Sequence, residues 1–298
     1  LTGTLIGRPK SATFRTADIV GLDTMCYVAN TGYEKCPNDP ERDVFKLPDY
    51  IQKMVENKWL GQKTKQGFYK KIDKGIIHSL DLKTMEYTPM NKKRYSAITL
   101  GKEKTLLPDR LKAIVKSDDI AGDFLWKTFS RTLLYASNLA GEISDDIFSI
   151  DRAMKWGFGR ELGPFEVLDS IGLNYFLERC RLDGMNIPQW LSGLQANNIE
   201  CIYKINDGKK YCYDIVTEDF KEIPSNLKNI DFKLLKSKNN VVKKHWSASL
   251  VDLDDGVAGI ELHSVLKPEL NPIDGSMMET LAYGLNWVKE NNYKGLIT

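Results

Sequence analysis

The strongest constraint on this chain is an internal repeat. The segment Gly7–Thr24 returns, with changes, as Gly157–Asn174 about halfway along the sequence. A repeat of this kind constrains the architecture first, because each copy is expected to form the same unit of structure. With an offset of 151 residues, the matched positions are Phe14 with Phe165, Asp18 with Asp169, Val20 with Ile171, Gly21 with Gly172 and Leu22 with Leu173.

In each copy, a proline and a glycine mark the start and the end of a short helix, and a second helix follows. Pro9 and Pro164 stand just before apolar residues at helical spacing, and proline fits the first turn of a helix. Gly21 and Gly172 follow these apolar residues. A helix often ends on a glycine, because the position after it needs a positive φ. We therefore predict a short helix, a glycine stop and a second helix in each copy.

The repeat extends into two β-rich segments. Phe68–Pro89 and Ile202–Pro224 share aromatic, basic and turn residues, with a shorter spacing in the second copy. In the first segment we predict a hairpin, with Gly75 in the turn and strands at 76–80 and 84–87. The expected duplication covers most of residues 7–89 and 157–224.

A long helix is predicted between the two copies. Residues 118–142 carry apolar side chains every three or four positions, which is a core-facing stripe. Ser144 is then expected to cap a helix over residues 145–156. No equivalent long helix precedes the first copy, so we expect this chain to be a piece of a longer protein.

The last part of the chain is rich in residues that favour β-strands. Residues 246–253 and 257–263 read as strands joined by Asp254-Asp-Gly256, a strong hairpin signal. Ser276 and Glu279 have the spacing of a capping box before an amphipathic helix. A further strand begins after that helix, so a unit of strand, strand, helix and strand is expected.

The composition is that of a globular protein without a nucleic-acid footprint. The 298 residues are 42% hydrophobic and 28% charged, and the net charge is +2. A nucleic-acid binder usually shows a basic face and a pI above about 9. No run reaches the roughly 18 apolar residues of a membrane span. The cysteines are Cys26, Cys36, Cys180, Cys201 and Cys212, without a Cys-x-x-Cys pair, and we expect buried thiols in a reducing cytoplasm.

Local motifs alone do not reveal a reaction. The sequence has no glycine-rich dinucleotide fingerprint, no phosphate loop and no pair of histidines at zinc-binding spacing. His78, His245 and His263 lie in or beside predicted strands without a neighbouring nucleophile. We interpret them as structural or surface histidines, and we predict no metal site.

Longer stretches resemble a known enzyme family. Ile6–Thr24 and Leu60–Tyr69 resemble the C-terminal helical domain of the 3-hydroxyacyl-CoA dehydrogenase family, and Ser144–Asp169 resembles the second copy that multifunctional members carry. The strands from His245 onward resemble the start of an enoyl-CoA hydratase (crotonase) domain. This order of domains resembles the fusion proteins of fatty-acid β-oxidation.

The resemblance implies an activity for the parent protein. The family oxidises (3S)-3-hydroxyacyl-CoA to 3-oxoacyl-CoA, and NAD takes the hydride. Its general base, a histidine held by a glutamate, belongs to an N-terminal Rossmann domain that this chain lacks. We therefore assign no catalytic and no cofactor-binding residue here, expect NAD to be bound by the missing domain, and expect this piece to be inactive and the parent cytoplasmic.

The resemblance also implies candidate binding residues. The loop and helix start from Gly7 would face the acyl-pantetheine arm of an acyl-CoA thioester, so the candidates are Lys10, Ser11 and Phe14; the alternative is ordinary helix entry and core packing. In the hydratase part, the backbone amide of Glu269 takes the place of an oxyanion-hole donor. The alternative there is a plain loop glutamate.

The expected fold is mainly α: a duplicated dehydrogenase C-terminal helical domain with short β-hairpins, followed by a partial α/β crotonase-like segment. The two helical copies are expected to pair as an intrachain pseudo-dimer, and a homo-oligomer is a further option. The alternatives to an enzyme part are a non-catalytic helical assembly module and a helical scaffold unrelated to acyl-CoA. The predicted domains are 1–105 and 106–226 (the two helical copies), 227–244 (a linker) and 245–298 (the hydratase start).

Overall fold

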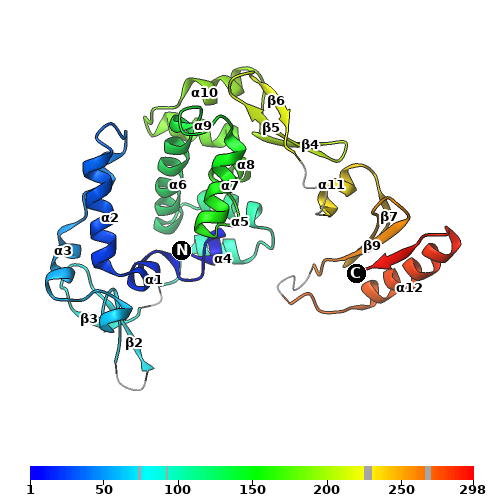
Figure 1. The fold of residues 1–298 in the computed structure, drawn as a ribbon. Helices are drawn as coiled ribbons and strands as arrows, with labels where there is room; N and C mark the ends of the chain where they lie inside the picture. The colour runs from blue at the N-terminus through cyan, green and yellow to red at the C-terminus, as the bar shows by residue number, and fades with distance from the viewer. Residues whose placement is uncertain (73–74, 92, 225–229, 266–269) are drawn as a thin grey trace. The chain divides into compact units, whose positions relative to one another are not determined.

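The chain forms two compact units in a computed structural model, which describes residues 1–298 except 73–74, 92, 225–229 and 266–269 (Figure 1). The first unit comprises Leu1–Ser144 and Ser149–Asn198, and the second comprises Asp145–Phe148 and Ile199–Thr298. About half of the structure is helical and the sheets are small, which agrees with a mainly α fold. The four predicted domains stay a prediction.

The first unit holds most of the helices. Its α-helices are α1 (Ala12–Val20), α2 (Leu22–Lys35), α3 (Asp49–Glu56), α4 (Ser96–Lys102), α5 (Leu107–Val115), α6 (Ile120–Leu139), α8 (Pro164–Ile171), α9 (Leu173–Leu182) and α10 (Gln189–Ala196), together with α7 (Ile147–Phe158) from Ser149 onward. Its short 3-10 helices are η1 (Thr4–Ile6), η2 (Arg42–Phe45) and η3 (Gln62–Thr64). An antiparallel sheet of β1 (Tyr69–Lys71), β2 (Ile77–Leu80) and β3 (Tyr87–Pro89) completes it.

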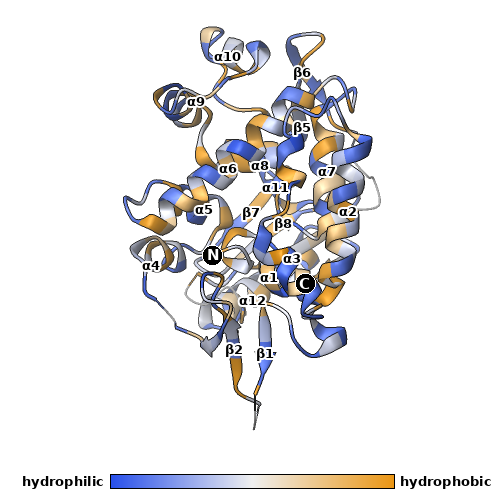
Figure 2. Cartoon of the chain, turned by 90° about the vertical axis from the view of Figure 1, so that its left-hand side faces the viewer, coloured by the Kyte–Doolittle hydropathy of each residue, from blue (hydrophilic) through white to orange (hydrophobic). Residues whose placement is uncertain are grey.

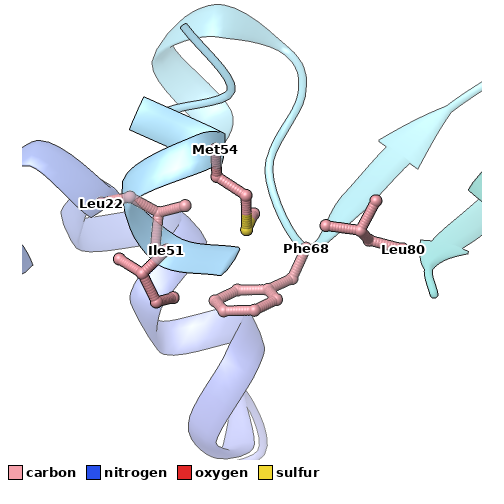
Figure 3. Close-up of a cluster of buried hydrophobic side chains, with 5 residues drawn as sticks. All are labelled: Leu22, Ile51, Met54, Phe68 and Leu80. Atoms are coloured by element: carbon pink, nitrogen blue, oxygen red, sulfur yellow. The ribbon is translucent and has the colours of Figure 1, made fainter. Parts of the chain in front are cut away.

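A small core joins the helices and the sheet of the first copy. Leu22 from α2 packs with Ile51 and Met54 from α3, and Phe68 and Leu80 close the cluster from the sheet side (Figure 3). Each of the five side chains is less than a tenth exposed. Burying side chains of this size contributes about 1.5–3 kcal/mol each, so this cluster ties α2 and α3 to the hairpin that follows them.

A second core lies between α5, α6, α8 and α9. The long helix α6 begins at Asp119, whose side chain accepts hydrogen bonds from the N–H groups of Ala121 and Gly122. It is amphipathic, and both hydrophobic and hydrophilic segments are visible along it (Figure 2). Its buried face packs against α5 and α8. The largest side chains in this core are Trp126, Phe165 and Phe176, all almost fully buried.

The second unit contains two sheets. An antiparallel sheet of β4 (Tyr203–Asn206), β5 (Lys209–Asp214) and β6 (Asp219–Glu222) comes first, and α11 (Phe232–Ser237) follows it. The other sheet has the order β10-β9-β8-β7, with β7 (Val241–Lys244), β8 (Ala248–Asp252), β9 (Val257–Leu262) and β10 (Gly295–Ile297). β10 runs parallel to β9, and α12 (Gly275–Glu290) connects the two strands and covers the sheet.

Several boundary predictions are confirmed. Pro164 stands in the first turn of α8, and α1 and α8 end at Gly21 and Gly172. The hairpin around Asp254-Asp-Gly256 forms, with Ser249 opposite Glu261 in the β8–β9 register. All three turn residues have positive φ, as a tight turn of this kind requires.

Other boundary predictions are wrong for local reasons. α1 begins at Ala12, three residues after Pro9, because η1 and a turn occupy the preceding stretch. α12 is capped by Asp274, whose carboxylate accepts the N–H of Met277, and not by Ser276. Part of the segment expected to be a linker forms α11 and β7. The helix predicted over 145–156 spans Ile147–Phe158.

The cysteines are only partly as expected. None of the five forms a disulfide, and Cys180 and Cys212 are buried. Cys36, however, is exposed, because it follows the last residue of α2 at the surface. Within the described residues, no helix is both long enough and apolar enough to cross a membrane.

Candidate ligand cavity beside α1

An open cavity of about 920 Å³ lies beside α1 in the first unit. It is built by the exposed side of α1, the glycine turn after α3 and the first hairpin. Its lining includes Arg15, Asp18, Gly61, Lys65, Tyr69 and Lys71. Except for Lys71, these residues come from the two segments 6–24 and 60–69, which carry the resemblance described above.

Asp18 holds the wall of this cavity together. Its buried carboxylate accepts the N–H of Phe68 at 2.8 Å and the N–H of Tyr69 at 2.9 Å. Burial raises the pKa of Asp18 above its usual value, and the two backbone bonds oppose that rise. A Cβ on Gly61 or Gly67 would overlap Asp18 atoms. These two glycines are therefore required for the close approach of the turn to α1.

Cationic side chains surround the cavity. Arg15 and Lys65 are exposed, and Lys70 and Lys71 extend from β1 along its edge. The ammonium group of Lys70 also lies over the ring of Tyr87, at 5.4 Å from its centre. Four cations against one buried carboxylate favour an anionic ligand. Backbone and aromatic groups lie beside the cations, and they could contact an uncharged part of the same ligand.

The lining of the cavity provides a buried carboxylate, a phenol and several cations. Burial raises the pKa of the Tyr69 phenol, so this group stays protonated at neutral pH. Among the described residues that line the cavity there is no histidine or cysteine beside a general base. No group of side chains suited to a metal ion occurs in the described part of the chain.

None of the three binding residues predicted from the resemblance lines this cavity. Lys10 is exposed in the turn before α1, and the Ser11 hydroxyl is 2.8 Å from that of Thr16. Phe14 is 43% exposed, and the centre of its ring lies 4.6 Å from that of Phe68. The basic residues of the cavity were not among the candidates predicted from the sequence. Their signal was the density of lysines around the glycine turn at 61–71.

The predicted oxyanion donor, Glu269, lies outside the described residues. Nearby, the side chain of Asn271 accepts the N–H of Ser264 at 2.9 Å and donates to the carbonyl of Leu262 at 3.3 Å. Asn271, which lies shortly before α12, is thus tied to the end of β9. The position of Glu269 as an oxyanion donor stays a prediction.

The histidines make ordinary structural contacts. A ring nitrogen of His78 lies 3.4 Å from the carbonyl oxygen of Tyr87 on the neighbouring strand. His263 hydrogen-bonds the hydroxyl of Ser249 at 2.9 Å across the β8–β9 pair. These contacts agree with the structural interpretation of both residues.

Comparison with known proteins points to the same part of the chain. The family model described as "3-hydroxyacyl-CoA dehydrogenase, C-terminal domain" matches residues 3–71. The chain is 42% identical over 297 residues to a Bacillus subtilis (strain 168) protein named "Probable 3-hydroxyacyl-CoA dehydrogenase"; the match covers 100% of this chain and 36% of that protein.

More distant relatives carry a second kind of name. Over 199 residues the chain is 26% identical to a Rickettsia felis protein named "Putative fatty acid oxidation complex trifunctional enzyme", covering 65% of this chain and 26% of that protein. A Rickettsia prowazekii protein of the same name is 22% identical over 246 residues, covering 79% of this chain and 32% of that protein. The chain thus spans about a third of the length of these relatives or less.

Proposed function

We propose that this chain is the helical, substrate-side part of an NAD-dependent 3-hydroxyacyl-CoA dehydrogenase of fatty-acid oxidation. One observation carries the proposal: the 42% identity to a probable dehydrogenase runs along the whole chain, and the family model falls on residues 3–71. That segment also supplies α1 and most of the lining of the cavity. The reaction converts the C3 hydroxyl of a 3-hydroxyacyl-CoA into a ketone, with one hydride transferred to NAD and one proton released.

The residues that the structure describes do not provide a fold suited to NAD. A dinucleotide needs a glycine-rich turn between a parallel strand and a helix. The one parallel strand pair in the described part of the chain is β9–β10, and the sequence between β9 and α12 lacks such a turn. We therefore assign NAD, and the general base that takes the hydroxyl proton, to a part of the protein outside this chain.

This chain would instead bind the CoA thioester. Arg15, Lys65, Lys70 and Lys71 would hold its phosphate groups at the cavity, because cations recognise phosphate oxygens strongly. Lys10, Ser11 and Phe14 would face the acyl-pantetheine arm on the adjoining surface. Phe14 has enough exposed ring area to contact an alkyl chain, and Phe68 supports it from behind.

We further propose that residues 245–298 begin an enoyl-CoA hydratase domain, with the amide of Glu269 as an oxyanion donor. The names of the Rickettsia relatives support a fusion of this kind. The antiparallel β8–β9 pair followed by α12 and a parallel β10 supports an α/β start. An oxyanion donor acts through its N–H, so the proposal does not depend on the glutamate side chain.

The duplicated helical domains would also form a pseudo-dimer within one chain. Both copies have the same element order, with three helices followed by a three-stranded antiparallel sheet. The loop before α1 meets the loop before α8, where the carbonyl of Gly7 accepts the N–H of Glu161 at 2.8 Å. The predicted contact between the helices Phe14–Leu22 and Phe165–Leu173 stays a prediction. A non-catalytic assembly module is the second candidate, and this loop contact favours it.

Binding and turnover assays on the 298-residue chain separate the two candidates. We expect acetoacetyl-CoA to bind, as measured by isothermal titration, and no oxidation of NADH when both are present. Lys65→Gln combined with Lys70→Gln should weaken binding at least about tenfold, and Lys112→Gln, an exposed lysine of α5, should not. If this chain alone oxidised NADH, the general base could not lie in another part of the protein. If all variants bound acetoacetyl-CoA with equal affinity, the cavity would not be the binding site.

A further inference from the structure

Two loops of the first unit meet at a pair of Gly-Arg sequences. Gly7 and Gly159 both have left-handed backbone conformations, with φ of 67° and 59°. The hydrogen bond from Glu161 N–H to the Gly7 carbonyl joins the two loops directly. The residues that follow the glycines, Arg8 and Arg160, therefore come to the same place, one from each copy of the repeat.

The two arginine side chains line one small pocket between α6 and the start of α8. Both are half-buried. The guanidinium of Arg8 lies over the ring of Phe129 at 5.7 Å, and that of Arg160 lies over the ring of Phe158 at 5.9 Å. Aromatic faces attract such cations, but they do not balance two full positive charges.

The described residues provide no counter-charge for this pair. Among the residues that the structure describes, neither guanidinium forms an ion pair with a carboxylate, and the exposed Glu161 side chain is paired with neither. Another partly buried arginine behaves differently. Arg179 donates to the carbonyl of Val115 at 2.9 Å and to the hydroxyl of Tyr175 at 2.8 Å. Unpaired burial is therefore a particular feature of Arg8 and Arg160.

Holding these two charges together costs free energy. Burial lowers the pKa of Arg8 to about 10, with a further contribution from the positive charge of Arg160, and burial also lowers the pKa of Arg160. Both side chains nevertheless stay protonated at neutral pH. Two like charges partly removed from water repel each other, so an anion placed between them would relieve the cost.

We infer that Arg8 and Arg160 form a binding site for a phosphate-type oxyanion at the junction of the two repeats. A guanidinium donates two parallel N–H bonds to a pair of phosphate oxygens. A divalent anion would balance both cations and hold the two loops together. The anion is either a free phosphate ion or the phosphate group of a larger ligand, such as CoA; both offer the same oxygens to the arginines. The inference does not depend on the proposed dehydrogenase function.

Thermal unfolding in phosphate and in chloride, at equal pH and ionic strength, tests the site. We expect phosphate to raise the midpoint of the native chain by several degrees more than chloride does, because a ligand that binds only the folded state stabilises it. Arg8→Gln and Arg160→Gln should each weaken phosphate binding by at least about tenfold. Arg94→Gln, which removes an exposed arginine elsewhere, should keep the full shift.

Two further measurements distinguish a binding role of the arginines from a purely structural one. In chloride, Arg8→Gln and Arg160→Gln should melt no lower than the native chain, since each removes one of two repelling charges. Arg8→Lys should bind phosphate with intermediate affinity, because it keeps the charge and loses the two-pronged geometry. A titration with CoA that displaces phosphate would identify a ligand phosphate as the source, and failure of CoA to compete would indicate the free ion. The inference is overturned if phosphate and chloride give the native chain the same midpoint, or if the glutamine variants retain the phosphate shift.

Discussion

Gly21 and Gly172 end their helices in nearly the same backbone conformation, with φ and ψ of 101° and 132° in the first and 99° and 120° in the second. The N–H of Gly21 donates to the carbonyl of Ala17, and the N–H of Gly172 donates to that of Leu168, both at 2.9 Å. A buried leucine follows each glycine and starts the next helix. The two copies of the repeat therefore share a local geometry at their most constrained point.

This geometry predicts that alanine is costly at both glycines. Side chains rarely adopt a φ near 100°, and holding one there costs about 1–3 kcal/mol. Around Gly172 there is open space for a Cβ, so Gly172→Ala measures the backbone strain alone. At Gly21 the added Cβ would also lie 2.9 Å from the flexible end of Lys63. Urea unfolding should show a similar loss for both variants, slightly larger for Gly21→Ala.

Gly157→Ala is the matched control. Gly157 lies inside α7 with open space around it and no positive φ. Alanine there should leave the free energy of unfolding unchanged or raise it by up to about 1 kcal/mol. A loss at Gly157 equal to that at Gly172 would show that strain at the helix stop is not the cause.

The sequence was sufficient where the signal is local. The glycine stops, the proline start of α8 and the Asp254-Asp-Gly256 turn each depend on residues next to one another. The sequence was insufficient to choose between two possible helix caps that lie within one turn of each other. Asp274 and Ser276 are both good caps, and the path of the chain into α12 brings the Asp274 carboxylate to the N–H of Met277.

The candidate cavity was less predictable than the fold, because its key contact joins distant residues. Asp18 binds the backbone of Phe68, which is 50 residues away in the sequence. Nothing local distinguishes this aspartate from a surface residue of an amphipathic helix. The lysines around it are recognisable as a group only after the turn has been placed against α1.

Replacing Asp18 should open the wall of the cavity. Asp18→Ala leaves the N–H groups of Phe68 and Tyr69 without their acceptor, and we expect a loss of about 3 kcal/mol in the free energy of unfolding. Asp18→Asn keeps one acceptor oxygen and should lose less. Chemical denaturation measures both, with Asp109→Asn as a control because that side chain is exposed at the start of α5. Equal stability of the Asp18 and Asp109 variants would contradict this role.

The cysteines should differ sharply in reactivity. Cys36 is exposed, whereas Cys180 is fully buried and burial raises its pKa to about 12. Because the thiolate is the reactive form, a disulfide reagent should label Cys36 rapidly in the native protein. Cys180 and Cys212 should react only in denaturant. The fast phase should disappear in Cys36→Ser; its persistence would mean that another thiol is accessible.

In the second unit, the stability should depend on the charge of Asp214. This side chain is 8% exposed and lies at the end of β5. Burial alone would raise its pKa, but Lys221 at 2.8 Å and the N–H and hydroxyl of Thr217 lower the pKa to about 2. The carboxylate is thus more acidic in the folded state than in the unfolded state. Its contribution is fully present above about pH 4 and is lost as the pH falls toward 2.

Asp214→Asn should therefore reduce the free energy of unfolding at pH 7 by about 2 kcal/mol, and the difference from the native chain should shrink to nothing near pH 2. Lys221→Gln should produce part of the same loss, because it removes one of the partners that lower the pKa. The double variant separates the ion pair from the Thr217 bonds, since the two single losses would not add if they report one interaction. A constant difference between native and Asp214→Asn proteins from pH 7 to pH 2 would show that the lost stability comes from packing and not from the ionised carboxylate.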